Sequence, residues 1–142
     1  MKRIFILCFS ILMVCAIALA ATKTYLDHWT YMNVNEAEKR WGSKVFSIES
    51  FKKGPISERA AEAANLLKKQ ALVGKTADEV VEALGSTSGY FWSDRFPTYF
   101  IEEGWTKKKD SWQIVFLLDA DERVTEVRIH KNCCYSKLPW TL

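Results

Sequence analysis

Hydrophobic and polar residues follow three successive patterns along this chain. Residues 4–19 are apolar except for Ser10, whereas between Ala60 and Leu84 apolar residues recur every three or four positions. After Gly85 they recur at every second position. A spacing of three or four residues indicates amphipathic helices, and a spacing of two residues indicates strands. The chain is therefore expected to carry an apolar leader, then helices, then a sheet.

Two helices are expected in the middle of the chain. Ser57 is the expected N-cap of the first helix, and Gly74 is expected to end it. Thr76 and Glu79 form a capping box for the second helix, which ends at Gly85. The short connection predicts that the two helices pack against each other. The apolar face of the first helix consists of Ala60, Ala63, Ala64 and Leu67.

The segment before these helices is mixed in character and rich in aromatic residues. Asn35 can cap a short helix that continues to Arg40, and Gly42 follows where such a helix would stop. We expect Ser43–Lys53 to be a loop that wraps onto the domain.

Extended structure is expected after Gly85. Residues 90–92 and 98–102 are candidate strands, 111–118 is the clearest strand, and 123–130 is the next. The polar residues 119–122 suit the turn of an antiparallel hairpin. Helices followed by such a meander predict an α+β fold in one domain.

The strand over 111–118 is apolar on both faces. Trp112, Ile114 and Phe116 lie on one face, and Val115 and Leu117 lie on the other. Something is therefore expected to cover the second face. The aromatic N-terminal segment is the first candidate, and a partner-binding surface is the alternative.

The N-terminus has the anatomy of a secretory signal. Lys2 and Arg3 precede the apolar run, and the run ends in Ala18-Leu19-Ala20, a pattern that signal peptidases cut. We expect cleavage near Ala20 and a periplasmic or secreted protein. Two alternatives would tether it to a membrane: an uncleaved anchor helix, or a lipid on Cys15.

The predicted organisation is a signal peptide (1–20), an N-terminal wrapping segment (21–54), an α+β domain (55–132) and a C-terminal tail (133–142). The formal net charge of +3 falls to +1 when Lys2 and Arg3 are removed. This balance gives no basic excess for nucleic acid. Of the four cysteines, only Cys133 and Cys134 lie outside the leader. Neighbouring cysteines cannot join distant segments, so the pair is a candidate disulfide or thiol site only.

No catalytic, cofactor or metal site is predicted. Gly74-Lys75-Thr76 lacks the earlier glycine and the preceding strand of a phosphate-binding loop, so nucleotide binding is not expected. Gly85–Gly89 has Thr87 where a nucleophile elbow needs serine. One enzymatic alternative stays open, in which Cys133 or Cys134 acts as a nucleophile with His130.

The aromatic residues between 90 and 112 are denser than a core of this size requires. Because Trp and Tyr are favoured contact anchors, some of them are expected at a binding surface. The predicted partner-contact residues are Tyr90, Trp92, Tyr99, Trp105, Val115 and Leu117.

Several local motifs resemble those of the SmpA/OmlA (BamE-like) outer-membrane and periplasmic family. They are Leu72–Thr76 followed by Glu79-Val80 and Leu84-Gly85, and the later runs 112–116 and 123–127. The resemblance implies two helices packed on one face of a three- to four-stranded antiparallel sheet, a scaffold shared with β-lactamase inhibitor protein.

The resemblance also implies a non-catalytic adaptor that holds another protein. We expect a protein-binding domain of the cell envelope, with outer-membrane assembly as one role. An inhibitor or immunity-type protein that binds a secreted hydrolase or toxin is the alternative. Neither requires a cofactor, a nucleotide or nucleic acid.

Overall fold

The computed structural model describes residues 13–22, 31–104 and 111–132. The chain divides into two compact units, Met1–Thr30 and Tyr31–Leu142. In the first unit, residues 13–22 form a helix whose apolar side chains are exposed. None of the helices in the described ranges combines the length and the apolar composition needed to cross a membrane.

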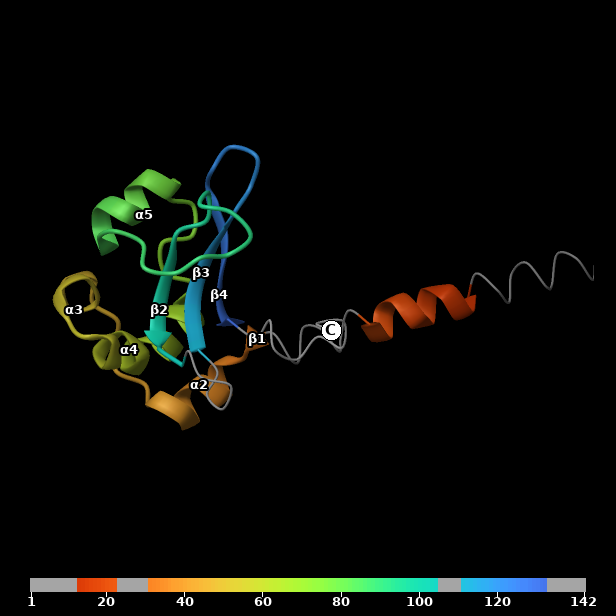
Figure 1. Ribbon diagram of the computed structural model, residues 1–142, viewed down its shortest axis with the longest axis horizontal. Coiled ribbons are helices and arrows are strands. Elements are labelled where there is room, and N and C mark those ends of the chain that lie inside the picture. Colours follow the sequence, from red (N-terminus) through yellow and green to blue (C-terminus); the bar gives the residue numbers. More distant parts are fainter. Residues whose placement is uncertain (1–12, 23–30, 105–110, 133–142) are drawn as a thin grey trace, which may run out of the picture. The chain divides into compact units, whose positions relative to one another are not determined.

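The second unit is built on an antiparallel sheet (Figure 1). Its strands lie in the order β1-β4-β3-β2. They are β1 (Tyr31–Met32), β2 (Thr98–Glu102), β3 (Ser111–Leu118) and β4 (Val124–Asn132). Adjacent strands pair antiparallel throughout. The predicted strands over 98–102, 111–118 and 123–130 are thus present, the last one shifted by a residue or two.

Four helices precede β2 in this unit and share one face of the sheet, which we call the helix face. They are α2 (Val34–Trp41), α3 (Ile48–Lys53), α4 (Ile56–Lys69) and α5 (Ala77–Leu84). All four contribute to one core with Tyr99, Ile114 and Phe116 of the sheet. The predicted α+β class with an antiparallel sheet is confirmed, and the helix face carries α2 and α3 in addition to the two helices expected.

Of the three predicted helix starts, one is confirmed and two are wrong. Helix α4 begins at Ile56 with Pro55 as its N-cap, instead of at Ser57, and has no side-chain capping bond. Thr76 and Glu79 form the predicted capping box of α5. The cap of α2 is Asn33 instead of Asn35, and Asn33 forms a capping box with Glu36. Asn35 is followed by Glu38 at the same spacing, so the capping-box pattern alone does not distinguish the two asparagines, and the structure uses the earlier one.

The segment 43–53 is wrongly predicted as a loop, because its second half forms α3. Ser47, the N-cap, makes no side-chain capping bond, so the usual start signal is absent. Tertiary packing stabilises the short helix instead. The Phe51 ring is fully buried and lies edge to face against Tyr99, at 5.6 Å between ring centroids.

Residues 44–47 lie along α4 and fix the N-terminal segment on the helix side. The Lys44 amide donates to the Ala61 carbonyl, and the Phe46 amide donates to Asn65 Oδ1. The side chains of Trp41, Phe46 and Phe51 belong to the helix-side core or pack on it. The prediction that this segment covers the other sheet face is therefore wrong for its described aromatics other than Tyr31.

Helix α4 ends at Lys69, five residues before the predicted stop at Gly74. Gln70 then adopts a left-handed conformation with φ of 47°. Its carboxamide bonds both backbone groups of Val127 on β4. Further on, Gly74 donates to Val124 O, so the turn after α4 lies along the outer edge of β4.

Candidate functional site

The face of the sheet opposite the helices is covered by residues 86–97, which we call the covering loop. This loop joins α5 to β2 and passes across β3 and β4 in Figure 1, in green to teal. Beneath it, Val115 is fully buried although it is not part of the helix-side core. The double-faced apolar pattern of β3 did require a cover, and the cover comes from this loop.

The first part of the covering loop is held by close backbone approach. The Ser88 and Gly89 amides both donate to Thr98 O at 3.0 Å, and Ser88 Oγ accepts from the Phe100 amide at 3.0 Å. A Cβ at Gly89 would lie 2.6 Å from Gln113 Oε1 and 2.8 Å from Thr98 Cγ2. Only glycine fits at this distance from the sheet. These contacts also occupy the outer edge of β2, which would otherwise be open to further pairing.

Gln113 anchors the middle of the loop from below. Its side chain is fully buried on β3, and Nε2 donates to Tyr90 O at 2.7 Å. Oε1 of the same side chain has no hydrogen-bond partner within the described ranges. A buried amide that bonds a loop carbonyl fixes the position of that loop, because leaving the carbonyl unpaired is costly.

Phe91 is the apolar anchor of the covering loop. It is buried, and its ring lies edge to face against His130 of β4 at 4.8 Å and against Phe96 at 5.8 Å between centroids. On its other side His130 contacts the Tyr31 ring of β1 at 5.3 Å. Burial lowers the pKa of His130 to about 4, and its Nδ1 has no partner in the described part of the chain. His130 is therefore neutral near pH 7 and acts as a packing residue.

Trp92 points out of the molecule from this anchored backbone. Its side chain is 81% exposed and its φ is +58°, an uncommon conformation for a bulky residue. The Ser93 amide donates to Phe91 O at 2.6 Å, which closes a three-residue γ-turn around Trp92. Tyr90, itself 57% exposed, donates its hydroxyl to Trp92 O at 2.7 Å. The result is an exposed aromatic pair on a fixed turn.

The far end of the covering loop is tied to the hairpin between β3 and β4. Arg95 donates to the Asp119 carbonyl and pairs with Glu122 at 3.9 Å. The Pro97 carbonyl accepts from the Phe116 amide at 3.0 Å. With both ends and the middle attached, the loop is a built part of the fold.

The predicted contact residues divide by their position relative to this loop. Tyr90 and Trp92 have the exposure that a contact residue needs. The prediction is wrong for Tyr99 and Val115, which are fully buried on the helix face and beneath the loop, respectively. Leu117 is half-buried on the loop face. Trp105, Cys133 and Cys134 lie outside the described residues.

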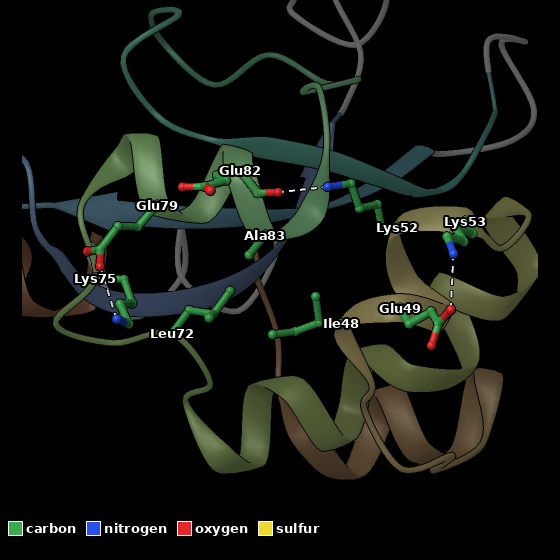
Figure 2. A pocket seen from close by; sticks show the side chains of 9 residues that line it. All are labelled: Ile48, Glu49, Lys52, Lys53, Leu72, Lys75, Glu79, Glu82 and Ala83. Carbon is green, nitrogen blue, oxygen red and sulfur yellow. Dashed lines mark hydrogen bonds and ion pairs between the residues drawn. The ribbon is translucent and has the colours of Figure 1, made fainter.

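A second candidate is the cleft between α3 and α5, with a volume of about 670 Å³. Figure 2 shows Ile48, Leu72 and Ala83 in its middle and charged side chains around the rim. The rim charges are balanced: Lys53 pairs with Glu49 and Lys75 pairs with Glu79, both at 3.0 Å. These pairs are exposed and weak, so no unbalanced charge is available to select a ligand.

Lys52 has a structural role in the same cleft. Its Nζ donates to Glu82 O at the end of α5, at 2.8 Å. Helix α5 has no basic residue in its own last turn. Lys52 of α3 therefore supplies the positive charge that favours a helix C-terminus.

A smaller hollow of about 420 Å³ lies where α2 and α4 meet β2. At its edge Glu102 accepts two hydrogen bonds from Arg40 and one from Trp41 Nε1, at 2.9, 2.9 and 2.8 Å. The Arg40 guanidinium also lies over the Trp41 and Trp112 rings. The network joins α2 to the end of β2.

The described ranges contain no assembled metal site. No group of three or more His, Cys, Asp or Glu side chains there could hold a metal ion. His130, the partner that the cysteine-nucleophile alternative needs, is half-buried and contacts the Phe91 and Tyr31 rings.

The covering loop could be found only in part from sequence. Sequence patterns alone do not mark Phe91, Gln113 and Gly89 as functional, although each holds the exposed aromatic pair in place. The available signals were the glycine before three consecutive aromatics and the apolar second face of β3. Comparison with protein-family models, with curated proteins and with solved structures found no match to this chain.

Proposed function

We propose that this chain is an exported, non-catalytic protein-binding domain of the cell envelope, and that the covering loop is its contact site with Trp92 at the centre. The predicted signal over residues 1–20 supports the location. The resemblance to the BamE-like family supports an adaptor that binds through loops or a sheet face, and outer-membrane assembly is one process in which it would act.

The observation that carries the proposal is the exposure of Trp92 on an immobilised, strained turn. A large apolar side chain in water has an unfavourable hydration free energy, and a bulky residue at positive φ adds about 1–3 kcal/mol of strain. Strained residues cluster at functional sites, and this is the reason for assigning the contact to Trp92. Because the turn is already fixed by Phe91 and Gln113, little further loop entropy is lost on binding.

A photo-crosslinking experiment tests the contact site. A photoreactive phenylalanine analogue replaces Trp92 in one variant and Val73 in a matched control, since Val73 is also exposed but lies after α4, away from the loop. Irradiation of intact cells is expected to link position 92, and not position 73, to one envelope protein.

Binding of the identified partner by the purified chain then tests the energetics. Trp92→Ala is expected to weaken binding by about 30-fold or more, as for a central contact residue, while Val73→Ala leaves it unchanged. Equal crosslinking at both positions, or unchanged binding by Trp92→Ala, would contradict the proposal.

A second function, inhibition of a secreted hydrolase or toxin, is favoured by one specific feature. Trp92, the more exposed of the aromatic pair and the central residue of the γ-turn, suits insertion into a concave active site. A neighbouring hydrolase or toxin gene would identify the target. Dose-dependent inhibition of that enzyme, lost in Trp92→Ala, would distinguish inhibition from adaptor binding.

A further inference from the structure

The chemistry beneath the covering loop differs from that of an ordinary apolar core. His130 of β4 lies directly opposite Gln113 of β3 in the sheet register. Both side chains are on the loop face, and both carry an atom without a hydrogen-bond partner in the described part of the chain: His130 Nδ1 and Gln113 Oε1. The same two side chains contact the loop, His130 through the Phe91 ring and Gln113 through the Tyr90 carbonyl.

We propose that His130 is a pH-sensitive latch for the covering loop. In its neutral form the imidazole packs against Phe91 and keeps the loop, and with it Trp92, on the sheet. Protonation places a charge beneath Phe91 and releases the loop. This inference rests on the proposed function, because it makes the presentation of the Trp92 contact site dependent on pH.

The groups around His130 do not neutralise a positive charge. On β4, Glu126 lies on the same face, but both of its carboxylate oxygens accept from Arg128, at 2.7 and 2.8 Å. The Arg128 guanidinium itself lies over the Tyr31 ring of β1, at 4.6 Å from the centroid. The Glu126 carboxylate is thus already paired with a cation, Arg128, on this face of the sheet.

The other two neighbouring elements do not supply a counter-charge either. β3 presents the neutral amide of Gln113. The covering loop presents the Phe91 ring, and of its charged residues Arg95 is engaged with Asp119 O and Glu122, while Asp94 is exposed. His130 is half-buried, so a protonated ring would gain by exposing more of its surface to water, and movement of Phe91 off the ring provides that exposure.

The loop is the element that can move. β4 pairs with β3 over its whole length, so exposing His130 from that side would break the sheet. Releasing the loop between Ser88 and Phe91 breaks the ring contacts of Phe91 and the bond from Gln113 to Tyr90 O. It also breaks the bonds from the Ser88 and Gly89 amides to Thr98 O, so these amides report the opening. Burial lowers the pKa of His130 from 6.5 to about 4. If loop opening restores the ordinary value, acid favours the open loop by up to about 300-fold, and by about 30-fold at pH 5.

Hydrogen exchange on the full chain, without any partner, tests the latch. Exchange of the amides in 86–93 is compared at pH 7.5 and pH 5 after correction for the intrinsic rate. The wild-type loop is expected to lose protection by about 10- to 30-fold at pH 5, while the amides paired between β3 and β4 keep theirs. His130→Phe, which keeps the ring contacts, is expected to show no such change. His28→Gln, which removes the other histidine, is expected to behave as wild type.

Several outcomes would overturn the inference. One is loop protection that does not change with pH, as expected if protonated Nδ1 donates to Gln113 Oε1 and the loop stays closed. Another is an equal change in His130→Phe. If that variant does not fold, an NMR titration of the wild type replaces it: the His130 ring and the Gly89 amide must share one midpoint, and separate midpoints would reject the latch.

The two proposals can fail independently. Suppose that loop exchange depends on pH in the wild type and not in His130→Phe, while Trp92→Ala binds the partner normally. This result would reject the contact site and support the latch. Normal loss of binding in Trp92→Ala with pH-independent exchange would reject the latch alone.

Discussion

The carboxamide of Gln70 replaces a strand residue beside Val127. Oε1 accepts from the Val127 amide at 2.8 Å, and Nε2 donates to the Val127 carbonyl at 3.1 Å. β1 covers the β4 edge at Ile129 and His130, and the turn after α4 covers it at Val124. Gln70 fills the position between them, and its left-handed backbone directs the side chain there while ending α4.

Gln70→Ala is expected to lower the free energy of unfolding by about 1–3 kcal/mol, because two backbone groups lose their partner. Gln70→Glu is also expected to lower the free energy of unfolding, although the two side chains have the same shape. A carboxylate can accept from the Val127 amide but repels the Val127 carbonyl. Urea unfolding followed by circular dichroism measures both. Stability of Gln70→Ala equal to wild type would mean that water replaces the side chain at no cost.

Gly89→Ala is expected to destabilise the covering loop because the new methyl group would meet Gln113 Oε1 and Thr98 Cγ2. Overpacking of this kind typically costs about 1–3 kcal/mol. The measurement is hydrogen exchange of 86–93 at pH 7.5, where protection should fall. Gly42→Ala is the control: φ there is +90° with open space, so it should cost about 1 kcal/mol in stability without changing exchange in the loop.

The buried hydroxyl of Tyr99 is expected to make the protein less stable at alkaline pH. Its hydroxyl donates to Gly85 O at 2.9 Å, and burial raises its pKa to about 12. The folded state therefore keeps a proton that the unfolded state loses above pH 10. Stability should fall as the pH rises from 10 through 12, by about 2 kcal/mol from this group.

The phenylalanine variant isolates this contribution. Tyr99→Phe should lose about 1 kcal/mol at pH 7 from the missing hydrogen bond, and the difference from wild type should shrink above pH 10. A difference that stays constant between pH 8 and pH 12 would show that Tyr99 does not titrate differently in the two states.

Lys52→Met is expected to lower stability by about 0.5–1 kcal/mol through loss of the charge at the end of α5. Lys53→Met is the matched control, because its exposed pair with Glu49 is worth only about 0.3–0.5 kcal/mol. Thermal unfolding at low and high salt measures both. Equal losses of stability in the two variants would show that Lys52 does not stabilise the C-terminus of α5.

The parts of the fold that could be predicted are those whose signals are local. The α5 capping box needs only Thr76 and Glu79, and the hairpin of β3 and β4 follows from alternation within one stretch of sequence. In contrast, β1 consists of two residues and exists only because it pairs with β4 about a hundred positions later. α3 lacks a side-chain cap and depends on the burial of Phe51.

The candidate site shows the same limit. Alternation places Tyr90 and Trp92 on one side and Phe91 on the other, and this sidedness agrees with their exposure although the segment is a turn and not a strand. What alternation could not give is the identity of the surface beneath Phe91. That depends on His130 and Gln113, which are neighbours only once β3 and β4 have paired.

Since the covering loop packs on a small cluster of its own, separate from the helix-side core, its outward residues are free to diversify without disturbing the scaffold. A library randomised at Tyr90, Trp92 and Asp94, with Gly89, Phe91 and Gln113 held constant, would convert this domain into a platform for selecting new binders.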